Sequence, residues 1–492
     1  MFRKIVKGIT FGLGAYLGYA FIAGNVLLHF KKPKSKEKMK IKGLTDYYGN
    51  DEDTGPDKAA LFDTQDILLT LHLNLIDSAK KTIKLANFSI KGGVASDLFY
   101  GKLLKAADKG VEVYILFDGK GHNLFGISNG KYWALMAHPN INLAFYEEFD
   151  WLRPWTWQNR MHDKYMISDK EYVLTGGVNL EDAFFVKDDE EAVYDRNVVI
   201  KNDVPERFDE SVLKEYTDYF ESMWYHPYTS IRPSYILNKY KVLASTSYKQ
   251  LTEAIEKAEE ENRYGAGESI AWDEHFYTTK KVSLVTNAIQ RWKKDPYILA
   301  TLGRFFDEAE ESVVFQSPYV VPSKEMREYI SLEGTDADIF ILTNSMAVST
   351  NFPAISGQRK YLQELSDKTT QLYHFQGKGY IHAKAYLFDR RLSLIGSFNF
   401  DPRSSFLSQE NLVIIDSYDL AAALGESIKT FARHGIPYKE SEKKLVESTA
   451  KNTPTPWYKK MILGLVLYFI TPFRGLIIKG FESKYVMGIK RE

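Results

Sequence analysis

The stretch IHAKAYLFDRRLSLIGSFNFDPRS, residues 381–404, carries a histidine and a lysine two positions apart inside an otherwise apolar strand pattern. Side chains at positions i and i+2 of a strand point to one face, so His382 and Lys384 are predicted to project together. Asp389 follows where the apolar run meets a turn, and a second run then returns to Asn399. Two costly polar groups on one strand face point to chemistry rather than to core packing.

The same pattern occurs upstream in RMHDKYMISDKEYVLTGGVNLED, residues 160–182. In both copies the histidine is followed by lysine after two residues, aspartate after seven, glycine after fourteen and asparagine after seventeen. The first copy comprises His162, Lys164, Asp169, Gly176 and Asn179, and the second comprises His382, Lys384, Asp389, Gly396 and Asn399. Two copies with identical spacing in a chain of ten histidines indicate an internal duplication rather than chance.

Helix and strand patterns alternate in both halves of the chain. Predicted helices cover 62–81, 94–110 and 131–137, then 298–312, 323–334 and 356–368; predicted strands cover 82–90, 111–119 and 141–149, then 313–321 and 336–345. Strands separated by such helices favour parallel pairing. We therefore predict an α/β fold of two similar halves, each a mostly parallel sheet flanked by helices, with one active site between the halves.

The composition is that of a folded protein without a strong charge bias. The apolar fraction is 44%, the charged fraction is 26%, and 64 basic residues balance 64 acidic ones. A protein that binds a nucleic-acid backbone usually has a basic surplus, so no nucleic-acid partner is expected. The chain has no cysteine, which excludes disulfides, zinc–thiolate sites and cysteine nucleophiles.

The N-terminal segment is unusually apolar, because residues 8–30 contain no Asp, Glu, Lys or Arg. This length suffices to span a hydrocarbon core of about 30 Å. The run is long for a signal peptide and no A-x-A site follows, so we predict an uncleaved transmembrane helix in the cell membrane. The basic run at 31–42 suits anionic headgroups and favours a cytoplasmic catalytic domain, although basic residues before the helix compete.

The expected organisation has five parts. These are a membrane anchor with a basic linker (1–45), a first half (46–230), a connecting region (231–290), a second half (291–445) and an amphipathic, membrane-associated C-terminal segment (446–492). The apolar run before Arg474 has only about 13 residues and contains Pro472, which is short for a second span. An interfacial segment and a buried core helix both stay open there.

A tryptophan-rich stretch, FYEEFDWLRPWTWQNR, precedes the first motif at residues 145–160. Tryptophan favours membrane interfaces, so Trp151, Trp155 and Trp157 could face lipid headgroups or line an acyl groove. A packed aromatic loop explains the stretch equally well, and the sequence leaves both interpretations open.

Two histidines, two lysines and two asparagines would converge if the motif ends of the two halves face each other. This set suits a phosphodiester, because lysines and amides stabilise the charge on its oxygens. One imidazole would attack phosphorus while the other protonates the leaving oxygen. No acidic cluster indicates a metal site. The lysines are therefore expected to offset the negative charge of the phosphodiester as a metal ion would, and no cofactor is predicted.

The duplicated motif resembles that of the phospholipase D superfamily over roughly residues 60–440. The segments GGVN after the first motif, SPYVVPS (317–323), LTNS (342–345) and GSFNFDPRS (396–404) are similar to those of bacterial cardiolipin synthases with a single N-terminal hydrophobic segment. The resemblance implies a covalent phosphohistidine intermediate and no metal ion.

The resemblance also assigns roles to residues of this chain. It implies a catalytic set of His162, Lys164, Asp169, His382, Lys384 and Asp389, with supporting or phosphate-binding residues Asn179, Asn399, Gly177, Ser397 and Glu410. His162 is expected to be the nucleophile and His382 the acid and base, while each motif aspartate orients its half. Gly177 stands where the second copy has Ser397, and Ser408-Gln409-Glu410 stands where related synthases often have Asn-x-Glu, so the choice of acceptor stays open.

The expected function is synthesis of cardiolipin from phosphatidylglycerol by a membrane-anchored phosphatidyltransferase. Hydrolysis to phosphatidic acid is the main alternative. A nuclease is a second alternative, which the neutral charge and the anchor disfavour, and a non-catalytic membrane scaffold is a third, which two intact motifs disfavour. The expected partners are a phospholipid substrate and the membrane, and the oligomeric state stays open.

Overall fold

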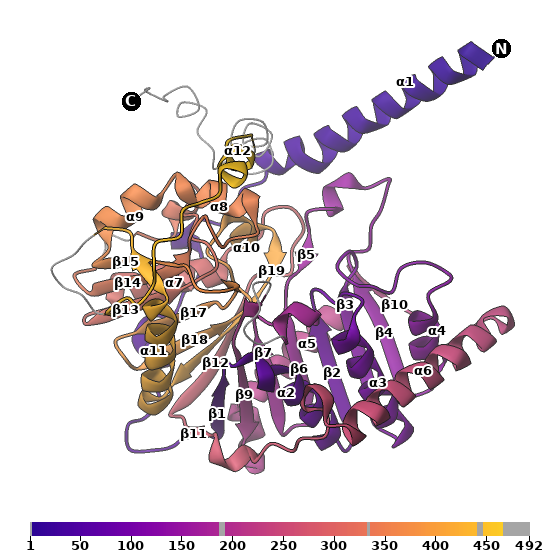
Figure 1. Ribbon diagram of the computed structural model, residues 1–492, viewed down its shortest axis with the longest axis horizontal. Helices are drawn as coiled ribbons and strands as arrows, with labels where there is room; N and C mark the ends of the chain where they lie inside the picture. Colours follow the sequence, from indigo (N-terminus) through magenta and orange to yellow (C-terminus); the bar gives the residue numbers. More distant parts are fainter. Residues whose placement is uncertain (1, 186–191, 332–334, 440–445, 466–492) are drawn as a thin grey trace.

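The computed structural model describes residues 2–185, 192–331, 335–439 and 446–465. It contains a nine-stranded and an eight-stranded mixed sheet, one for each half of the chain, with helices around and between them (Figure 1). The described chain is therefore an α/β protein of two similar halves, as the sequence predicts.

The strands of the two sheets follow one plan. The first sheet consists of β1 (Asp57–Phe62), β2 (Thr82–Asn87), β3 (Glu112–Asp118), β4 (Ile141–Tyr146), β6 (Lys164–Ser168), β7 (Tyr172–Gly176), β9 (Asn197–Asn202), β10 (Thr229–Ile231) and β11 (Tyr277–Thr278). The second consists of β12 (Lys281–Thr286), β13 (Ser312–Gln316), β14 (Asp338–Asn344), β15 (Gln371–Phe375), β17 (Ala385–Phe388), β18 (Leu392–Gly396), β20 (Asn411–Asp416) and β21 (Gly435–Pro437).

The strand orders show that the halves are a structural duplication. The order β10-β4-β3-β2-β6-β7-β9-β1 of the first sheet corresponds strand by strand to β21-β15-β14-β13-β17-β18-β20-β12 of the second. Parallel and antiparallel pairs fall at the same places in both. Each motif occupies the same antiparallel pair of its half, β6–β7 or β17–β18.

The expectation of mostly parallel sheets was wrong. Only β2-β3-β4 and β13-β14-β15 pair in parallel, and the other pairs within the two sheets are antiparallel. The parallel pairs of the first half are linked by crossover helices, whereas the motif strands are joined by tight turns. A tight turn reverses the chain and so gives antiparallel pairing.

The helices cover the outer faces of the sheets and also pack between them. They are α2 (Gln65–Ser78), α3 (Val94–Asp108), α4 (Gly130–Ala137), α5 (Val212–Trp224) and α6 (Lys241–Glu260) before the second sheet, then α7 (Tyr297–Glu308), α8 (Phe352–Arg359), α9 (Leu362–Lys368), α10 (Pro402–Phe406), α11 (Tyr418–Arg433) and α12 (Trp457–Leu465). Side chains of α5 and α11 share one buried apolar cluster with strands of both sheets. This common core holds the halves together.

Some local predictions differ from the structure. The helix expected at 323–334 is a single turn at Met326–Glu328 in its described part, and the one expected at 356–368 is interrupted between α8 and α9. The region 231–290 contains α6, which packs against α3 and α4, and also β12, an edge strand of the second sheet. Much of this polar region is therefore built into the two halves.

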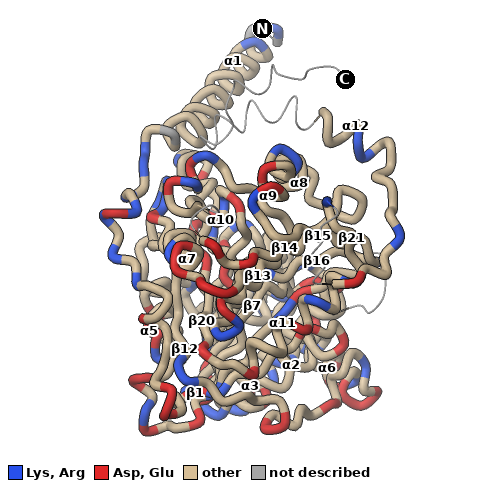
Figure 2. The backbone as a smooth tube through the Cα atoms, turned by 90° about the vertical axis from the view of Figure 1, so that its left-hand side faces the viewer, with Lys and Arg blue, Asp and Glu red and all other residues tan. Residues whose placement is uncertain are grey.

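The N-terminal helix α1 (Phe2–Phe21) projects from the body of the protein (Figures 1 and 2). Residues Ile5–Val26 are long and apolar enough to cross a membrane, and only 6% of the most apolar window is buried. The following linker runs along the second half, where Lys34 and Lys36 form ion pairs with Asp295 and Asp307. Two of the lysines expected to face headgroups therefore have carboxylate partners.

At the other end of the chain, α12 lies against α8. The rest of the predicted C-terminal segment, residues 466–492, lies outside the described residues.

Candidate active site

Both motif histidines lie just before the first strand of their hairpin. His162 lies between the short strand β5 (Arg160–Met161) and β6, and His382 lies between β16 (Tyr380–Ile381) and β17. Lys164 and Lys384 follow two residues later and are buried. The alternation of side chains along extended backbone places each histidine and lysine on the same side, as the sequence predicts.

Short strands exchanged between the halves bring the two motifs together. β5 pairs in parallel with β19 (Ser408–Gln409) of the second half, and β16 pairs in parallel with β8 (Val193–Tyr194) of the first half. The backbone N–H of His162 donates to the carbonyl of Gln409 at 2.8 Å, and that of His382 donates to Tyr194 at 2.7 Å. Each histidine is thus held by the backbone of the other half.

The same exchange gives each imidazole a buried carboxylate. Nδ1 of His162 lies 2.9 Å from Oε2 of Glu410, and Nδ1 of His382 lies 2.5 Å from Oδ2 of Asp195. Both carboxylates are fully buried, and both imidazoles are largely buried. A carboxylate at Nδ1 fixes the orientation of the ring and leaves Nε2 as the reactive atom.

The lysines lie beside the histidines. Nζ of Lys164 donates to the carbonyl of His162 at 2.6 Å, while Nζ of Lys384 donates to the carbonyl of His382 and lies 2.7 Å from its Nδ1. Two aromatic rings flank the imidazoles: Phe88 lies 4.6 Å from His162, ring centre to ring centre, in a T-shaped arrangement. Phe184 makes the equivalent contact with His382 at 5.3 Å.

Burial shifts the pKa values of the four basic groups downward, and for Lys164, His162 and His382 repulsion between cations adds to the shift. Burial, followed by repulsion from Lys384, lowers the pKa of Lys164 to about 7, and burial lowers that of Lys384 to about 8. Burial and Lys384 lower the pKa of His382 to about 4, and burial with Lys164 holds that of His162 well below its usual value. An anion placed among these groups would oppose the repulsive part of the shifts of Lys164, His162 and His382.

The two carboxylates have different protonation properties. Burial raises the pKa of Glu410 to about 7. Burial also acts to raise the pKa of Asp195, but Lys384 and His382 outweigh it and hold this pKa below its usual value. At neutral pH the Asp195 carboxyl group is therefore ionised, whereas Glu410 is partly protonated.

Asn179 and Asn399 occupy equivalent positions after the two hairpins. Both side chains are buried, and neither Oδ1 atom reaches a hydrogen-bond partner among the described residues. A buried amide without a partner is costly, so these amides are suited to a ligand. Both supporting asparagines predicted from the sequence have this property.

The difference between Gly177 and Ser397 has a steric explanation. The hydroxyl of Ser397 donates to Oε2 of Glu410 at 2.5 Å. At the equivalent place in the first half, a Cβ atom on Gly177 would collide with Oδ1 of Asp195. The carboxylate of the shorter Asp195 side chain lies where a side chain at 177 would be, so only glycine fits there.

The motif aspartates, by contrast, lie away from the histidines, at the far ends of the first hairpin strands. The carboxylate of Asp169 accepts hydrogen bonds from the backbone N–H groups of residues 80, 81 and 82, and that of Asp389 accepts from residues 310, 311 and 312. Both aspartates have positive φ, which Asp tolerates better than most residues. They belong to the scaffold rather than to the reacting set.

Sequence reasoning missed three residues of this site: Asp195, Phe88 and Phe184. Asp195 could have been found from the sequence, because each half has a carboxylate one or two residues before the strand that pairs with its hairpin, β9 or β20. Asp195 precedes β9 by two residues and Glu410 immediately precedes β20, but their distances from the motif histidines differ. No spacing in the sequence identifies Phe88 and Phe184 as residues of the site.

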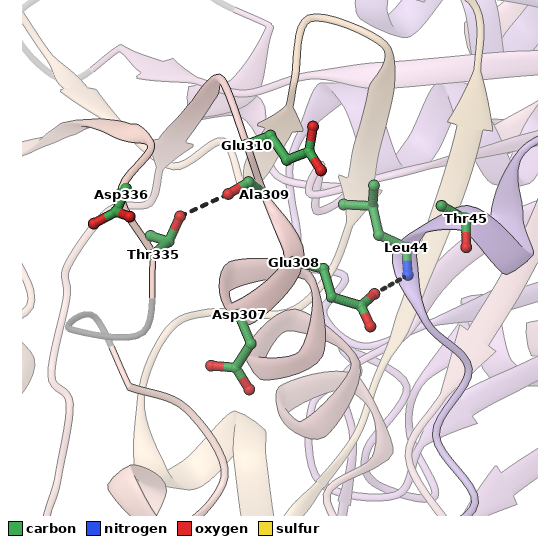
Figure 3. A pocket seen from close by; sticks show the side chains of 8 residues that line it. All are labelled: Leu44, Thr45, Asp307, Glu308, Ala309, Glu310, Thr335 and Asp336. Carbon is green, nitrogen blue, oxygen red and sulfur yellow. Dashed lines mark hydrogen bonds between the residues drawn. The ribbon is translucent and has the colours of Figure 1, made fainter.

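One other hollow, of about 600 Å³, opens beside the C-terminal end of α7 (Figure 3). Its lining is strongly acidic, with Asp307, Glu308, Glu310 and Asp336, and Glu308 accepts from the backbone N–H of Leu44 at 2.6 Å. The backbone of Glu310 also binds Asp389, which places this hollow at the end of the second sheet away from His382. Its charge disfavours a phosphate ligand.

Among the described residues, no group of three or more His, Asp or Glu side chains is arranged to hold a metal ion. The chemistry this geometry can support is nucleophilic attack by one imidazole with proton transfer by the other, next to ammonium groups that bind an anion.

Comparison with known proteins places this chain in the phospholipase D superfamily, because the family described as "Cardiolipin synthase, PLD-like domain" matches residues 72–224 and 302–432. An uncharacterized protein of Helicobacter pylori is 24% identical over 499 residues, covering 91% of this chain and 96% of the relative. Cardiolipin synthase C of Escherichia coli is 24% identical over 389 residues, covering 70% of this chain and 79% of that protein.

Among solved structures, phosphatidylserine synthase of Haemophilus influenzae matches with a TM-score of 0.57 and 15% sequence identity. The match covers 88% of this chain and 96% of that one, and at this identity it shows a common fold. The chain is thus a phosphodiester-modifying enzyme of the phospholipase D superfamily, with the duplicated fold of that family.

Proposed function

We propose that this protein is a membrane-anchored phosphatidyltransferase that makes cardiolipin from two molecules of phosphatidylglycerol. Membership of the family of cardiolipin synthase PLD-like domains supports the substrate class, as does similarity to Cardiolipin synthase C over most of its length. The observation that carries the proposal is the pair of buried imidazoles, each hydrogen-bonded to a carboxylate from the other half and each beside a lysine.

In the first step, Nε2 of His162 attacks the phosphorus of one phosphatidylglycerol. A bond forms between nitrogen and phosphorus while the bond from phosphorus to the glycerol headgroup oxygen breaks, and protonated His382 gives its proton to that oxygen. Glu410 accepts the hydrogen bond from Nδ1–H of His162 and stabilises the positive charge that this ring acquires. Glycerol leaves, and the phosphatidyl group stays bound to His162.

In the second step, neutral His382 removes the proton from a headgroup hydroxyl of a second phosphatidylglycerol. The resulting oxygen attacks phosphorus, the nitrogen–phosphorus bond breaks, and His162 returns to its starting state. The products are cardiolipin and glycerol, and His382 ends protonated, as it began.

The lysines and asparagines bind the oxygens of the phosphodiester that do not react. Lys164 and Lys384 offset its negative charge, the Nδ2–H groups of Asn179 and Asn399 donate hydrogen bonds to it, and their unpaired Oδ1 atoms are free to accept from a headgroup hydroxyl. The bound anion in turn screens the lysines from His382, which raises the pKa of His382 and lets it carry the proton needed in the first step. Substrate binding therefore prepares the acid.

The proposed location is the membrane, with α1 as a transmembrane anchor and the catalytic halves on the cytoplasmic side. The length and composition of Ile5–Val26 support the anchor. The basic residues after this helix support the orientation.

The test is incubation of the detergent-solubilised full chain with labelled phosphatidylglycerol, with a His382→Ala variant as the control. Cardiolipin and glycerol are the expected products, and the variant should form neither. Phosphatidic acid without cardiolipin would identify a hydrolase instead. A parallel reaction with single-stranded DNA checks for a nuclease, since cleavage of DNA without turnover of lipid would refute both lipid activities. A chelator should leave the rate unchanged within about twofold, because the mechanism uses no metal ion.

A further inference from the structure

Two neighbouring loops beside the candidate site expose large apolar side chains. The first follows β3 and exposes Phe125 and Ile127, at 56% and 73% of their surface. The second follows β4 and exposes Trp151 and Leu152, at 65% and 78%. Since β3 and β4 are adjacent and parallel, their following loops leave the same edge of the sheet.

The bases of these loops are joined, so the exposed tips belong to one surface. The backbone N–H of Gly119 donates to the carbonyl of Tyr146 at 2.7 Å, and Nζ of Lys120 donates to the carbonyl of Glu147. The second loop then leads through Pro154–Thr156 into β5 and His162. Apolar tips of this size on adjacent loops indicate a partner surface.

The second loop also contacts the membrane helix. The hydroxyl of Tyr16 donates to the carbonyl of Trp151 at 3.0 Å, and that of Tyr19 donates to the carbonyl of Leu152 at 2.5 Å. Tyr19 and Tyr16 precede the end of the apolar stretch at Val26 by seven and ten residues, so at helical rise they lie about 10 and 15 Å inside it. A bilayer that contains α1 therefore extends to the level of this loop tip.

The composition of the tips suits such a position. Tryptophan and aromatic side chains favour the membrane interface, and isoleucine and leucine favour the hydrocarbon. The two charges next to the tip, Asp150 and Arg153, form an ion pair at 2.6 Å, which lowers the cost of leaving water. The rings of Phe149 and Trp157 stack with their centres 4.9 Å apart and stabilise the base of this loop.

We propose that the loops of residues 119–129 and 149–157 insert their tips into the bilayer that α1 spans, forming a lipid-docking surface that holds His162 at the membrane. The partner is the lipid bilayer itself. This inference rests on the proposed function only in taking α1 as a membrane anchor. It explains how the site reaches a lipid substrate that stays in the membrane. It also selects the membrane-facing interpretation of the tryptophan-rich stretch.

The natural chain lacks cysteine, so single cysteines can report the position of each tip. The single variants Leu152→Cys and Ile127→Cys of the full chain are each labelled with a polarity-sensitive fluorophore. They are then reconstituted into vesicles of phosphatidylcholine and phosphatidylglycerol. Tyr418→Cys is the control, because this exposed residue hydrogen-bonds to Arg391 beside the turn of the second motif, at the far end of that sheet. Labels at 152 and 127 should be quenched by a lipid-borne quencher at least fivefold more than the label at 418.

Equal access of a water-soluble quencher to all three labels would overturn the proposal. So would labels at 152 and 127 that are shielded equally in vesicles and in a lipid-free amphipathic polymer, because that result shows that this chain or a second copy of it covers the tips. A second measurement compares turnover of phosphatidylglycerol in vesicles with turnover of a soluble short-chain analogue. For Trp151→Ser combined with Leu152→Ser this ratio should fall at least tenfold, with no fall for Tyr418→Ser, and an unchanged ratio would contradict the docking role. If the natural chain turns over neither lipid, the proposed function fails, whereas the fluorescence result still decides the docking surface.

Discussion

The imidazole of His162 lies 2.9 Å from the carboxylate of Glu410, a residue 248 positions later in the other half of the chain. His382 and Asp195 form the reciprocal pair across 187 positions. Each half therefore contributes the histidine of one pair and the carboxylate of the other. Neither half contains a complete pair, so each half needs the other to form the site.

Replacing Glu410 by glutamine should reduce the turnover number by roughly 10²- to 10⁴-fold, the range seen when a carboxylate beside a catalytic imidazole loses its charge. Glutamine keeps the size of the side chain but cannot stabilise the positive ring of His162 by charge. Steady-state kinetics on phosphatidylglycerol would measure the effect, and Asp195→Asn should show a comparable loss. A turnover number within threefold of the natural protein for Glu410→Gln would contradict the proposed role.

With a phosphatidyl ester whose leaving group needs no proton, such as p-nitrophenol, the His382→Ala variant should accumulate a phosphatidyl adduct on His162. Without His382 the acceptor hydroxyl keeps its proton, so transfer from His162 becomes the slow step. Peptide mass spectrometry at neutral pH would locate the adduct after incubation with this ester. The His162→Ala variant should show none, and an adduct on His382 in that variant would reverse the two roles.

Affinity for a soluble phosphodiester should fall as the pH rises from 6.5 to 9, by roughly tenfold or more. Lysine is charged below its pKa, and burial lowers the pKa of Lys164 to about 7 and that of Lys384 to about 8. Raising the pH through this range therefore removes positive charge from the empty site, while a diester keeps its single negative charge. Competition with substrate at several pH values would measure the affinity.

The matched control is Lys164→Met, which should bind the diester more weakly at pH 6.5 and show a shallower pH dependence. An affinity that is constant across the range in the natural protein would show that the lysines stay charged.

Asp169→Ala should destabilise the fold by about 2–4 kcal/mol and change the turnover number of folded enzyme by less than about threefold. The substitution removes three hydrogen bonds to the backbone N–H groups of residues 80–82 and leaves alanine with positive φ. Asp169→Asn should lose less, since asparagine tolerates this backbone conformation and keeps one acceptor oxygen. Thermal unfolding in detergent would rank the three proteins, and a stable but inactive Asp169→Ala variant would return this aspartate to the catalytic set.

Gly177→Ala should impair catalysis although it adds a single methyl group. The new Cβ would occupy the place of Oδ1 of Asp195 and displace this carboxylate from His382. We expect at least a tenfold fall in the turnover number, together with a lower thermal midpoint, because the displaced carboxylate is buried. Ser397→Ala tests the equivalent place in the second half, where a methyl group fits, and it should lower activity less.

Local sequence rules predicted the parts of the site that lie on one strand. The two-residue step from histidine to lysine in each motif was enough to place both on one face, because side chains alternate along extended backbone. The duplicated spacing likewise predicted two similar halves. The prediction of mostly parallel sheets was wrong because the alternation of helices and strands in residues 82–146 does not continue into the motif hairpins. There, tight turns reverse the chain.

The sequence by itself determined that histidine, lysine and asparagine recur as two equivalent sets, since identical spacing needs no knowledge of distant contacts. Only the tertiary structure decided that Asp195 and Glu410 serve histidines of the opposite half and that Asp169 and Asp389 lie at the other end of their sheets. It also decided that the loop before His162 contacts the N-terminal helix α1. These relationships depend on exchanged strands and packed loops, and a pairing between residues so far apart in the chain leaves no periodic trace in one sequence.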